Sequence, residues 1–132
     1  MADTTPTRAV AEFASDVRHS KLDPEVTHAV RRAMLDSIGV MAAGTRHPAS
    51  AKVIGMIEDL GTTGPCRIVG SAHLTDPVNA ALANGVSAHV FDWDDTILPT
   101  RAHLGAALLP PLRAAGETRG WTLDAIVPAF AV

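Results

Sequence analysis

Apolar residues recur every three or four positions along most of the chain, which is the pattern of helices that bury one face. The first such stretch covers residues 7–19. The second has a strong start signal, because Asp23 can cap a helix whose first position is Pro24, and it ends at Gly44. A third stretch covers residues 49–60 and is followed by a glycine. The first half of the chain is therefore predicted to form three helices.

The second half of the chain combines a short extended segment with further helices. Turn-forming residues bound the segment 64–70 and predict at most one small strand. An Asp-Pro pair at 76–77 opens a fourth helix, whose many small residues predict burial on nearly all sides. A fifth helix is predicted over 104–118, kinked or delayed by two adjacent prolines, and a sixth from residue 123, broken by Pro128. The predicted apolar stripe of the fourth helix consists of Val78, Ala81, Leu82, Gly85, Val86 and His89.

These elements place the chain in the all-α class, with about six helices and at most one short strand. Residues 1–132 are predicted to form a single helical domain, because no linker or low-complexity stretch divides them. The sequence stops inside apolar helical sequence without a residue that typically ends a helix. We therefore expect a fragment of a larger domain.

Composition narrows the class of protein. Hydrophobic residues make up 47% and charged residues 19% of the chain, which is typical of a globular protein. A net charge of −3 with scattered basic residues argues against a nucleic-acid partner. No apolar signal core opens the chain, and no apolar run approaches the roughly 18 residues that a membrane span needs. We expect a soluble cytoplasmic protein in which the single cysteine, Cys66, is a small buried apolar residue.

One polar segment, residues 89–105, concentrates the chemically reactive side chains between two predicted helices. Loops held by packed helices are frequent places for functional sites. The segment carries His89, Asp92, Asp94, Asp95, Thr96, Arg101 and His103. Three interpretations of this segment compete.

The first interpretation is a phosphatase. Asp-Trp-Asp-Asp-Thr at 92–96 resembles the first motif of the haloacid dehalogenase-like phosphotransferases, in which the first aspartate is the nucleophile and the second is the general acid. Asp92 and Asp94 would then also hold magnesium. That motif follows a buried parallel strand, whereas residues 80–88 have helical periodicity and no lysine follows the motif. Both features argue against this interpretation.

The second interpretation is a metal site. The three aspartates, with His89 or His103, offer ligands for magnesium, manganese or zinc. No pair of histidines at helical spacing supports such a site. The carboxylates could equally be satisfied by backbone amides and Arg101.

The third interpretation rests on a resemblance that covers most of the chain. Residues 80–96 read Ala-Ala-Leu-Ala-Asn-Gly-Val-Ser-Ala-His-Val-Phe-Asp-Trp-Asp-Asp-Thr, and His-Leu-Gly follows at 103–105. This run resembles the MmgE/PrpD family, whose members show Asn-Gly, then His-x-x-Asp-[Phe/Tyr]-Asp-Asp, then a His-Pro-Gly-like helix start. Arg-Ala-Met-Leu-Asp-Ser-Ile-Gly-Val-Met-Ala-Ala-Gly at 32–44 resembles a second, earlier pattern of the family. Leu104 is a departure, because the family has proline there.

The resemblance implies the N-terminal part of a large helical domain, with the lid domain and the C-terminal helices of a complete member absent from these residues. The family includes 2-methylcitrate dehydratase, cis-aconitate decarboxylase and iminodisuccinate epimerase, which act without a metal or organic cofactor. The implied function is a cofactor-independent lyase or isomerase for small di- or tricarboxylates, with dehydration, decarboxylation and epimerisation all open. It further implies a homodimer, and the fragment alone is expected to be inactive.

The resemblance also implies roles for particular residues, because Asp92, Thr96 and His103 match positions that line the family's pocket. We expect His103 to face an anionic substrate beside free backbone amides near Gly105. Asp92 would act as base or orient His103, and Thr96 would donate a hydrogen bond to a substrate carboxylate or hydroxyl. Arg101 would pair with substrate or with the aspartates. The expected catalytic residues are thus Asp92 and His103, the substrate-binding residues are Thr96, Arg101 and Gly105, and none is a metal ligand.

The remaining polar residues of the segment have simpler expectations. His89 falls on the apolar stripe and is predicted to be a hydrogen-bonded core histidine. Asp94 and Asp95 are expected to cap and order the loop or to contact substrate. A different class of function also stays open, namely a non-catalytic helical remnant that associates through exposed apolar faces.

Overall fold

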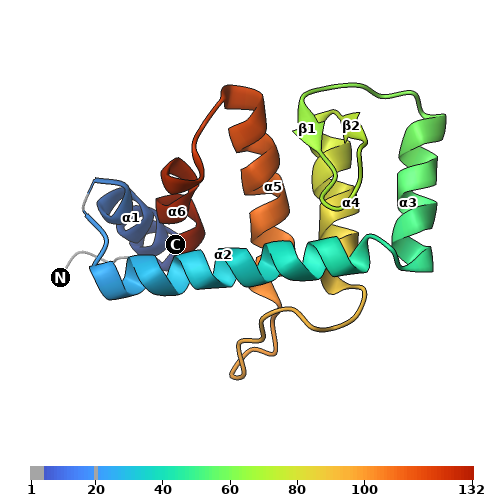
Figure 1. Ribbon diagram of the computed structural model, residues 1–132. Helices are drawn as coiled ribbons and strands as arrows, with labels where there is room; N and C mark the ends of the chain where they lie inside the picture. Colours follow the sequence, from blue (N-terminus) through green and yellow to red (C-terminus); the bar gives the residue numbers. More distant parts are fainter. Residues whose placement is uncertain (1–4, 20) are drawn as a thin grey trace.

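The longest helix, α2, crosses the molecule, and the other elements are arranged around it (Figure 1). The computed structural model describes residues 5–19 and 21–132. Helices α3, α4 and α5 stand on one side of α2, whereas α1 and α6 lie together near its N-terminal end (Figure 1). The elements are α1 (Pro6–His19), α2 (Pro24–Gly44), α3 (Pro48–Asp59), β1 (Cys66–Arg67), β2 (Leu74–Thr75), α4 (Pro77–His89), α5 (Leu104–Arg119) and α6 (Leu123–Ala131).

The predicted all-α class is confirmed, and the helix starts follow from local capping chemistry. Asp23 caps α2 by accepting a hydrogen bond of 2.7 Å from the Glu25 backbone N–H. Asp76 caps α4 in the same way, accepting bonds of 2.9 Å from the Val78 N–H and 3.1 Å from the Asn79 N–H. The backbone hydrogen bond from Asn79 is the main reason why the pKa of the Asp76 carboxyl lies below its ordinary value.

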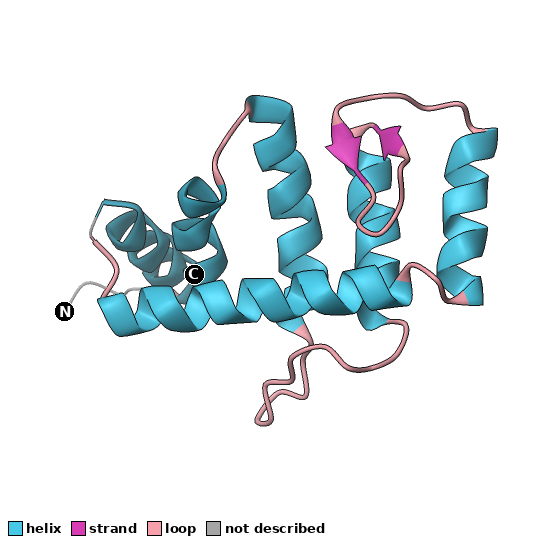
Figure 2. Ribbon diagram, viewed as in Figure 1, coloured by secondary structure: helices cyan, strands magenta, loops and turns pink. Residues whose placement is uncertain are grey.

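The extended segment predicted at 64–70 forms one strand of a two-stranded antiparallel hairpin, in which Cys66 lies opposite Thr75 (Figure 2). The second strand was not predicted, because a two-residue strand leaves no periodicity to detect. Asn84 of α4 ties the hairpin to the core: its Oδ1 accepts from the Val69 N–H at 2.8 Å, and its Nδ2 donates to the Arg67 carbonyl at 3.0 Å. Cys66 is fully buried, as predicted.

The prediction that Pro128 breaks the sixth helix is wrong, and Pro110 and Pro111 do not delay the start of the fifth. Helix α5 is continuous across Pro110 and Pro111, and α6 is continuous across Pro128. A proline at position 110 removes the N–H that would bond to the carbonyl of Ala106. That carbonyl lies against Gly85 of α4, where an added Cβ would be 3.4 Å from its oxygen. Gly85 of α4 thus lies against α5 at the turn in which Pro110 leaves one carbonyl without its helical donor.

Helix α4 is buried on a different face from the predicted one. Its buried residues are the small ones, namely Ala80, Ala83, Asn84, Ser87 and Ala88. Val78 and Leu82 of the predicted stripe are 75% and 46% exposed, so the prediction of burial on nearly all sides is wrong. The reason is close helix packing: an added Cβ on Gly44 of α2 would stand 1.8 Å from the Ser87 carbonyl oxygen. Small side chains bring the two backbones together, and larger ones are left outside.

The main apolar core lies where α2 meets α4, α5 and α6, and a smaller cluster around Ile57 and Ile68 joins α3 to the hairpin. None of the helices in the described part of the chain has both the length and the apolar character that crossing a membrane would require. The main core consists of Met34, Met41, Ala88, Leu109, Ile126 and Val127.

Candidate functional site

The polar segment forms a loop, residues 90–103, that links α4 to α5 and extends past α2 on the side away from α3, α4 and α5 (Figure 1). Its tip is closed by backbone hydrogen bonds from Ile97 to Ala102 at 2.9 Å and from Arg101 to Ile97 at 2.7 Å. The element before the loop is the helix α4, so the buried strand that a haloacid dehalogenase-like motif needs does not precede Asp92 in this structure.

Asp95 fastens the loop to the start of α5. Its Oδ1 accepts a hydrogen bond of 2.8 Å from the Gly105 backbone N–H. An added Cβ at Gly105 would stand 2.3 Å from that oxygen and 2.6 Å from Ser37 Oγ, so a side chain there would displace the Asp95 carboxylate and the Ser37 hydroxyl. The amide that was expected to be free for substrate at Gly105 is therefore bonded within the protein. This corrects the sequence-based expectation, because the carboxylate that binds the helix N-terminus is Asp95.

Asp94 lies buried between two imidazoles. Its side chain is fully enclosed, with both carboxylate oxygens 3.1 Å from His89 Nδ1. On the other side, His103 Nδ1 lies 3.4 Å from Asp94 Oδ1. His103 Nδ1 is itself buried and makes no hydrogen bond within the described residues, so the two atoms are close but not aligned for bonding. The rings of His89 and His103 meet edge to face, 4.9 Å apart between centroids.

Asp92 approaches His103 from the outer side. Its Oδ1 lies 3.6 Å from His103 Nε2, and its side chain is 76% exposed. Asp92 has a backbone φ of 57°, a left-handed conformation that is uncommon for residues other than glycine but that aspartate adopts more often than most. This turn sends the side chains of Asp92 and Asp94 to opposite nitrogens of the same ring. His103 therefore stands between two carboxylates, one buried and one open to solvent.

The prediction for His89 is right about its hydrogen bond and wrong about its burial. It is hydrogen-bonded, as predicted, but its side chain is 54% exposed, so it is not a core residue. It stands at the last position of α4, where the helix gives way to the loop. Its role is to hold the buried Asp94 carboxylate from the end of a helix.

Thr96 and Arg101 both lie on the exposed side of the loop. Arg101 has a left-handed φ of 52° and forms no ion pair with any aspartate in the described part of the chain. Of the two partners predicted for Arg101, the aspartates do not pair with it in this structure. The hydroxyl of Thr96 and the guanidinium of Arg101 are both accessible to a ligand.

Aromatic side chains flank the cluster on the outer surface. Phe91 and Trp93 are stacked with ring centroids 4.7 Å apart, and His47, from the turn before α3, meets Phe91 edge to face at 5.2 Å. Trp93 is 65% exposed. The loop therefore presents a flat apolar surface next to a polar cluster, which is an arrangement suited to binding a small molecule or a further protein segment.

The cluster can offer a set of metal ligands. One ligand atom each from His89, Asp92, Asp94 and His103 lie within 4.8 Å of one another. Among the described residues, neither Asp92 nor Asp94 pairs with a lysine or arginine. No lysine or arginine of the described residues therefore compensates the charge of these two carboxylates.

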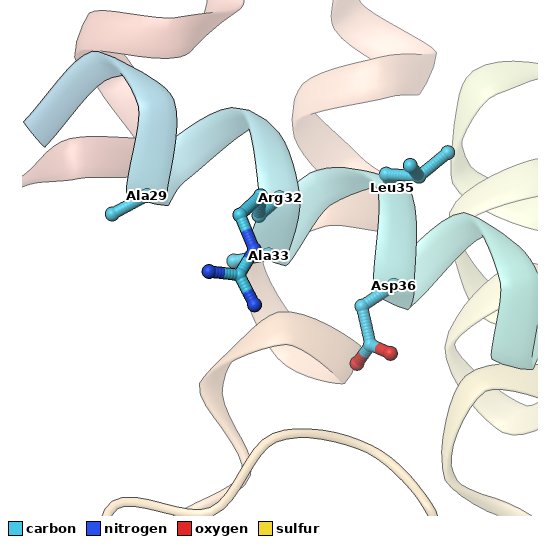
Figure 3. A pocket seen from close by; sticks show the side chains of 5 residues that line it. All are labelled: Ala29, Arg32, Ala33, Leu35 and Asp36. Carbon is cyan, nitrogen blue, oxygen red and sulfur yellow. The ribbon is translucent and has the colours of Figure 1, made fainter. Parts of the chain in front are cut away.

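A shallow hollow of about 540 Å³ lies elsewhere, against α2. Arg32 and Asp36 project from the same side of this helix, one turn apart (Figure 3). None of the residues that line the hollow belongs to the loop, so the hollow and the polar cluster are separate features.

Residues 8–132 match the model of the MmgE/PrpD N-terminal domain. A cis-aconitate decarboxylase of Aspergillus terreus is 26% identical over 123 residues, which cover 91% of this chain and 25% of the relative. A cis-aconitate decarboxylase of Mus musculus is 30% identical over 112 residues, covering 84% of this chain and 23% of the relative. The chain thus spans about a quarter of the length of these curated relatives. No solved structure matches it.

Proposed function

Because its residues 8–132 match the family's N-terminal domain, the chain belongs to the MmgE/PrpD family, and we propose that its 90–103 loop forms one wall of a pocket for small carboxylates. The family match supports an enzyme of lyase or isomerase type. The chain carries one part of such an enzyme's length, so the activity proposed is that of a protein that contains this chain.

The observation that carries the proposal is the position of His103 between Asp94 and Asp92. An ionised carboxylate only accepts hydrogen bonds, so Asp94 favours the tautomer in which the His103 proton is on Nδ1. Nε2 then has a free lone pair on the side that faces Asp92 and solvent. The separation of 3.4 Å between Nδ1 and Asp94 is long for a hydrogen bond, and such contacts commonly tighten when substrate binds.

The proposed chemistry is a proton transfer at the carbon next to a carboxylate. His103 Nε2 takes the proton, and the electron pair of the broken C–H bond moves toward the neighbouring carboxylate. In a dehydration the hydroxyl group of the next carbon then leaves as water by taking the proton back from His103, and in an epimerisation the proton returns to the opposite face of the carbon. In a decarboxylation the same nitrogen gives a proton to the carbon that loses carbon dioxide. Asp92 then lies where it can stabilise the imidazolium form of His103 or share its proton.

Thr96 and Arg101 supply the proposed contacts with substrate. The exposed hydroxyl of Thr96 can donate to a carboxylate or hydroxyl, and the guanidinium of Arg101 can pair with a second carboxylate. Gly105 serves indirectly, because it lets Asp95 hold the loop to α5. We propose that no metal or organic cofactor takes part in turnover.

The experiment uses the protein expressed from the whole native reading frame that contains these residues. We expect it to act on at least one of cis-aconitate, 2-methylcitrate and iminodisuccinate, or to exchange a carbon-bound hydrogen of one of them with deuterated water, which NMR detects. His103→Asn should lower this rate by roughly 10²-fold to 10⁴-fold, which is the usual contribution of a general base. Turnover or exchange that His103→Asn leaves unchanged would overturn the assignment.

The matched control is His28→Asn, because His28 is an exposed histidine of α2 outside the loop. It should retain the wild-type rate. Circular dichroism and thermal melting of both variants separate loss of chemistry from loss of folding.

We also propose that the protein forms a homodimer. Self-association is expected both for the enzyme and for the alternative, a non-catalytic helical interaction module. Large apolar side chains are exposed on and beside α1 and α6: Val10 by 62%, Phe13 by 53% and Trp121 by 50%. Ultracentrifugation tests this proposal, and a monomer at all concentrations would contradict it. A dimer that acts on none of the three carboxylates would favour the non-catalytic module.

A further inference from the structure

We propose that His89, Asp94 and His103, with Asp92 as the fourth ligand, bind one divalent transition-metal ion of the zinc type, and that this ion inhibits the enzyme. The binding site does not depend on the proposed function. Only the inhibition rests on it, because inhibition requires His103 to be the proton-transferring group.

The spacing of the ligand atoms is close to what such an ion needs. Zinc bonds to nitrogen and oxygen are about 2.0–2.2 Å long, so neighbouring ligand atoms in a tetrahedral site stand roughly 3.4 Å apart. Asp94 Oδ1 lies 3.1 Å from His89 Nδ1 and 3.4 Å from His103 Nδ1. One atom of each of the four residues lies within 4.8 Å of the others, and Asp92, whose Oδ1 lies 3.6 Å from His103 Nε2, must turn its side chain to reach an ion held at Nδ1. Its exposed side chain can make that movement.

His103 Nδ1 gives a second and independent indication of a ligand. It is a buried polar atom that points toward Asp94 yet makes no hydrogen bond within the described residues. Buried polar atoms in native proteins nearly always have a partner, and a bound water or ion is an established explanation for an exception. A cation at this point would bond to both Nδ1 and the Asp94 carboxylate.

Charge and ligand type select the ion. With both imidazoles neutral, Asp92 and Asp94 give the cluster a charge that a dication cancels, and neither pairs with lysine or arginine among the described residues. Two imidazole nitrogens and two carboxylate oxygens suit zinc, cobalt or nickel. Magnesium prefers an oxygen-only octahedron and retains water, so it should bind far more weakly.

An ion bound at this site would inhibit turnover because it removes the proton acceptor. An imidazole bound to a metal through Nδ1 carries its remaining proton on Nε2. His103 in that state has no lone pair on Nε2 with which to take a proton from substrate. The ion also occupies Asp94, which otherwise fixes the His103 tautomer.

Binding is tested on the 132-residue chain with cobalt(II) as the probe, after any purification tag and bound metal have been removed. We expect visible absorption bands of tetrahedral cobalt that saturate at one ion per chain and vanish when zinc is added. Trp93 is next to Asp92 and Asp94 in sequence, so cobalt should quench its fluorescence. The quenching should persist in Trp121→Phe and disappear in Trp93→Phe.

Substitutions test whether the ion binds to these residues. His89→Asn should weaken cobalt binding by about tenfold to a hundredfold or more, because even outer-shell changes at metal sites have effects of that size. His28→Asn should leave it unchanged. If His89→Asn does not fold, chemical-shift changes at the His89 and His103 rings on adding zinc to the wild-type chain decide the question instead. Absence of one-to-one cobalt binding, or equal binding by a folded His89→Asn variant, would overturn the proposal.

The inhibition arm uses the protein from the whole reading frame. Zinc should lower the turnover of the wild-type protein, and a chelator should restore it. The same zinc concentration should produce a smaller fractional loss in His89→Asn, measured relative to that variant's own zinc-free rate. If cobalt binds as expected but turnover is not inhibited, the metal site stands and the proposed role of His103 fails. If turnover requires His103 but no metal binds, the proposed role of His103 stands and the metal site fails.

Discussion

The packed frame of α2, α4 and α5 and the loop at 90–103 place their side chains in opposite ways. In the frame, Met34, Met41 and Leu109 are fully enclosed. In the loop, Leu98 and Trp93 are 81% and 65% exposed, whereas the carboxylate of Asp94 is buried. Apolar burial therefore stabilises the frame, and polar contacts hold the loop.

The loop is attached to the frame through polar contacts at its two ends. His89 at the end of α4 holds Asp94, and Gly105 at the start of α5 holds Asp95. Between these contacts, Asp92 and Arg101 adopt left-handed backbone conformations that cost free energy for residues with a side chain. Substitutions in the frame should therefore alter the stability of the fold, whereas substitutions in the loop should alter catalysis and ligand binding.

Truncation of one leucine in each region should give the largest contrast in stability. Leu109→Ala removes a fully buried side chain from the core and should lower the free energy of unfolding by about 2–5 kcal/mol. Leu98→Ala, at the exposed loop, should change it by less than about 0.5 kcal/mol. Urea denaturation of the chain measures both values. Similar losses in the two variants would remove the distinction between frame and loop.

Two glycines of α2 differ in how closely other atoms of the frame approach them. Gly44→Ala would place a Cβ 1.8 Å from the Ser87 carbonyl oxygen, and separating α2 from α4 should cost about 1–3 kcal/mol. Gly39→Ala has no neighbouring atom within 4 Å and should stabilise the helix by roughly 0.5–1 kcal/mol. Thermal melting should shift in opposite directions for the two variants. A stabilised Gly44→Ala would show that α2 and α4 do not rely on close backbone contact.

The smallest effect concerns the acid stability of the frame through the α4 cap. Hydrogen bonds, led by that from the Asn79 backbone, lower the pKa of Asp76 in the folded chain. Its contribution to stability is therefore complete above the ordinary aspartate pKa of about 3.9 and is lost as the pH falls through the lower folded value. Asp76→Asn retains a capping side chain but does not titrate. The stability difference between wild type and Asp76→Asn should change only at acid pH, and a difference that varies between neutral pH and pH 5 would argue against this cap.

Local chemistry made the helix starts predictable, whereas the buried faces depend on non-local packing. Asp23 was identified as a cap and the Asp76-Pro77 pair as a helix start, because a capping residue acts on the next three positions. The exposed Val78 could not be anticipated, because small residues on the other face of α4 bring the neighbouring helices into contact.

The candidate site was predictable as a segment but not in its internal arrangement. The sequence indicated the cluster, with Asp92 and His103 as its leading residues. Three neighbouring aspartates cannot be distinguished by composition, so the buried position of Asp94 and the bond from Gly105 to Asp95 were not predicted. Aspartate is among the few residues that adopt a left-handed backbone, but the three neighbouring aspartates do not indicate which of them does so, and in the structure it is Asp92.

The arrangement of Asp94 and His103 is the central claim, and the tautomer of the His103 ring tests it most directly. Long-range proton–nitrogen NMR correlations of the metal-free chain, at a pH where the ring is neutral, show which nitrogen carries the proton. We predict Nδ1–H for His103 in the wild-type chain, and a shift of the population toward Nε2–H in Asp94→Asn. A His103 ring that carries its proton on Nε2 in the wild-type chain, or that does not respond to Asp94→Asn, would contradict the account.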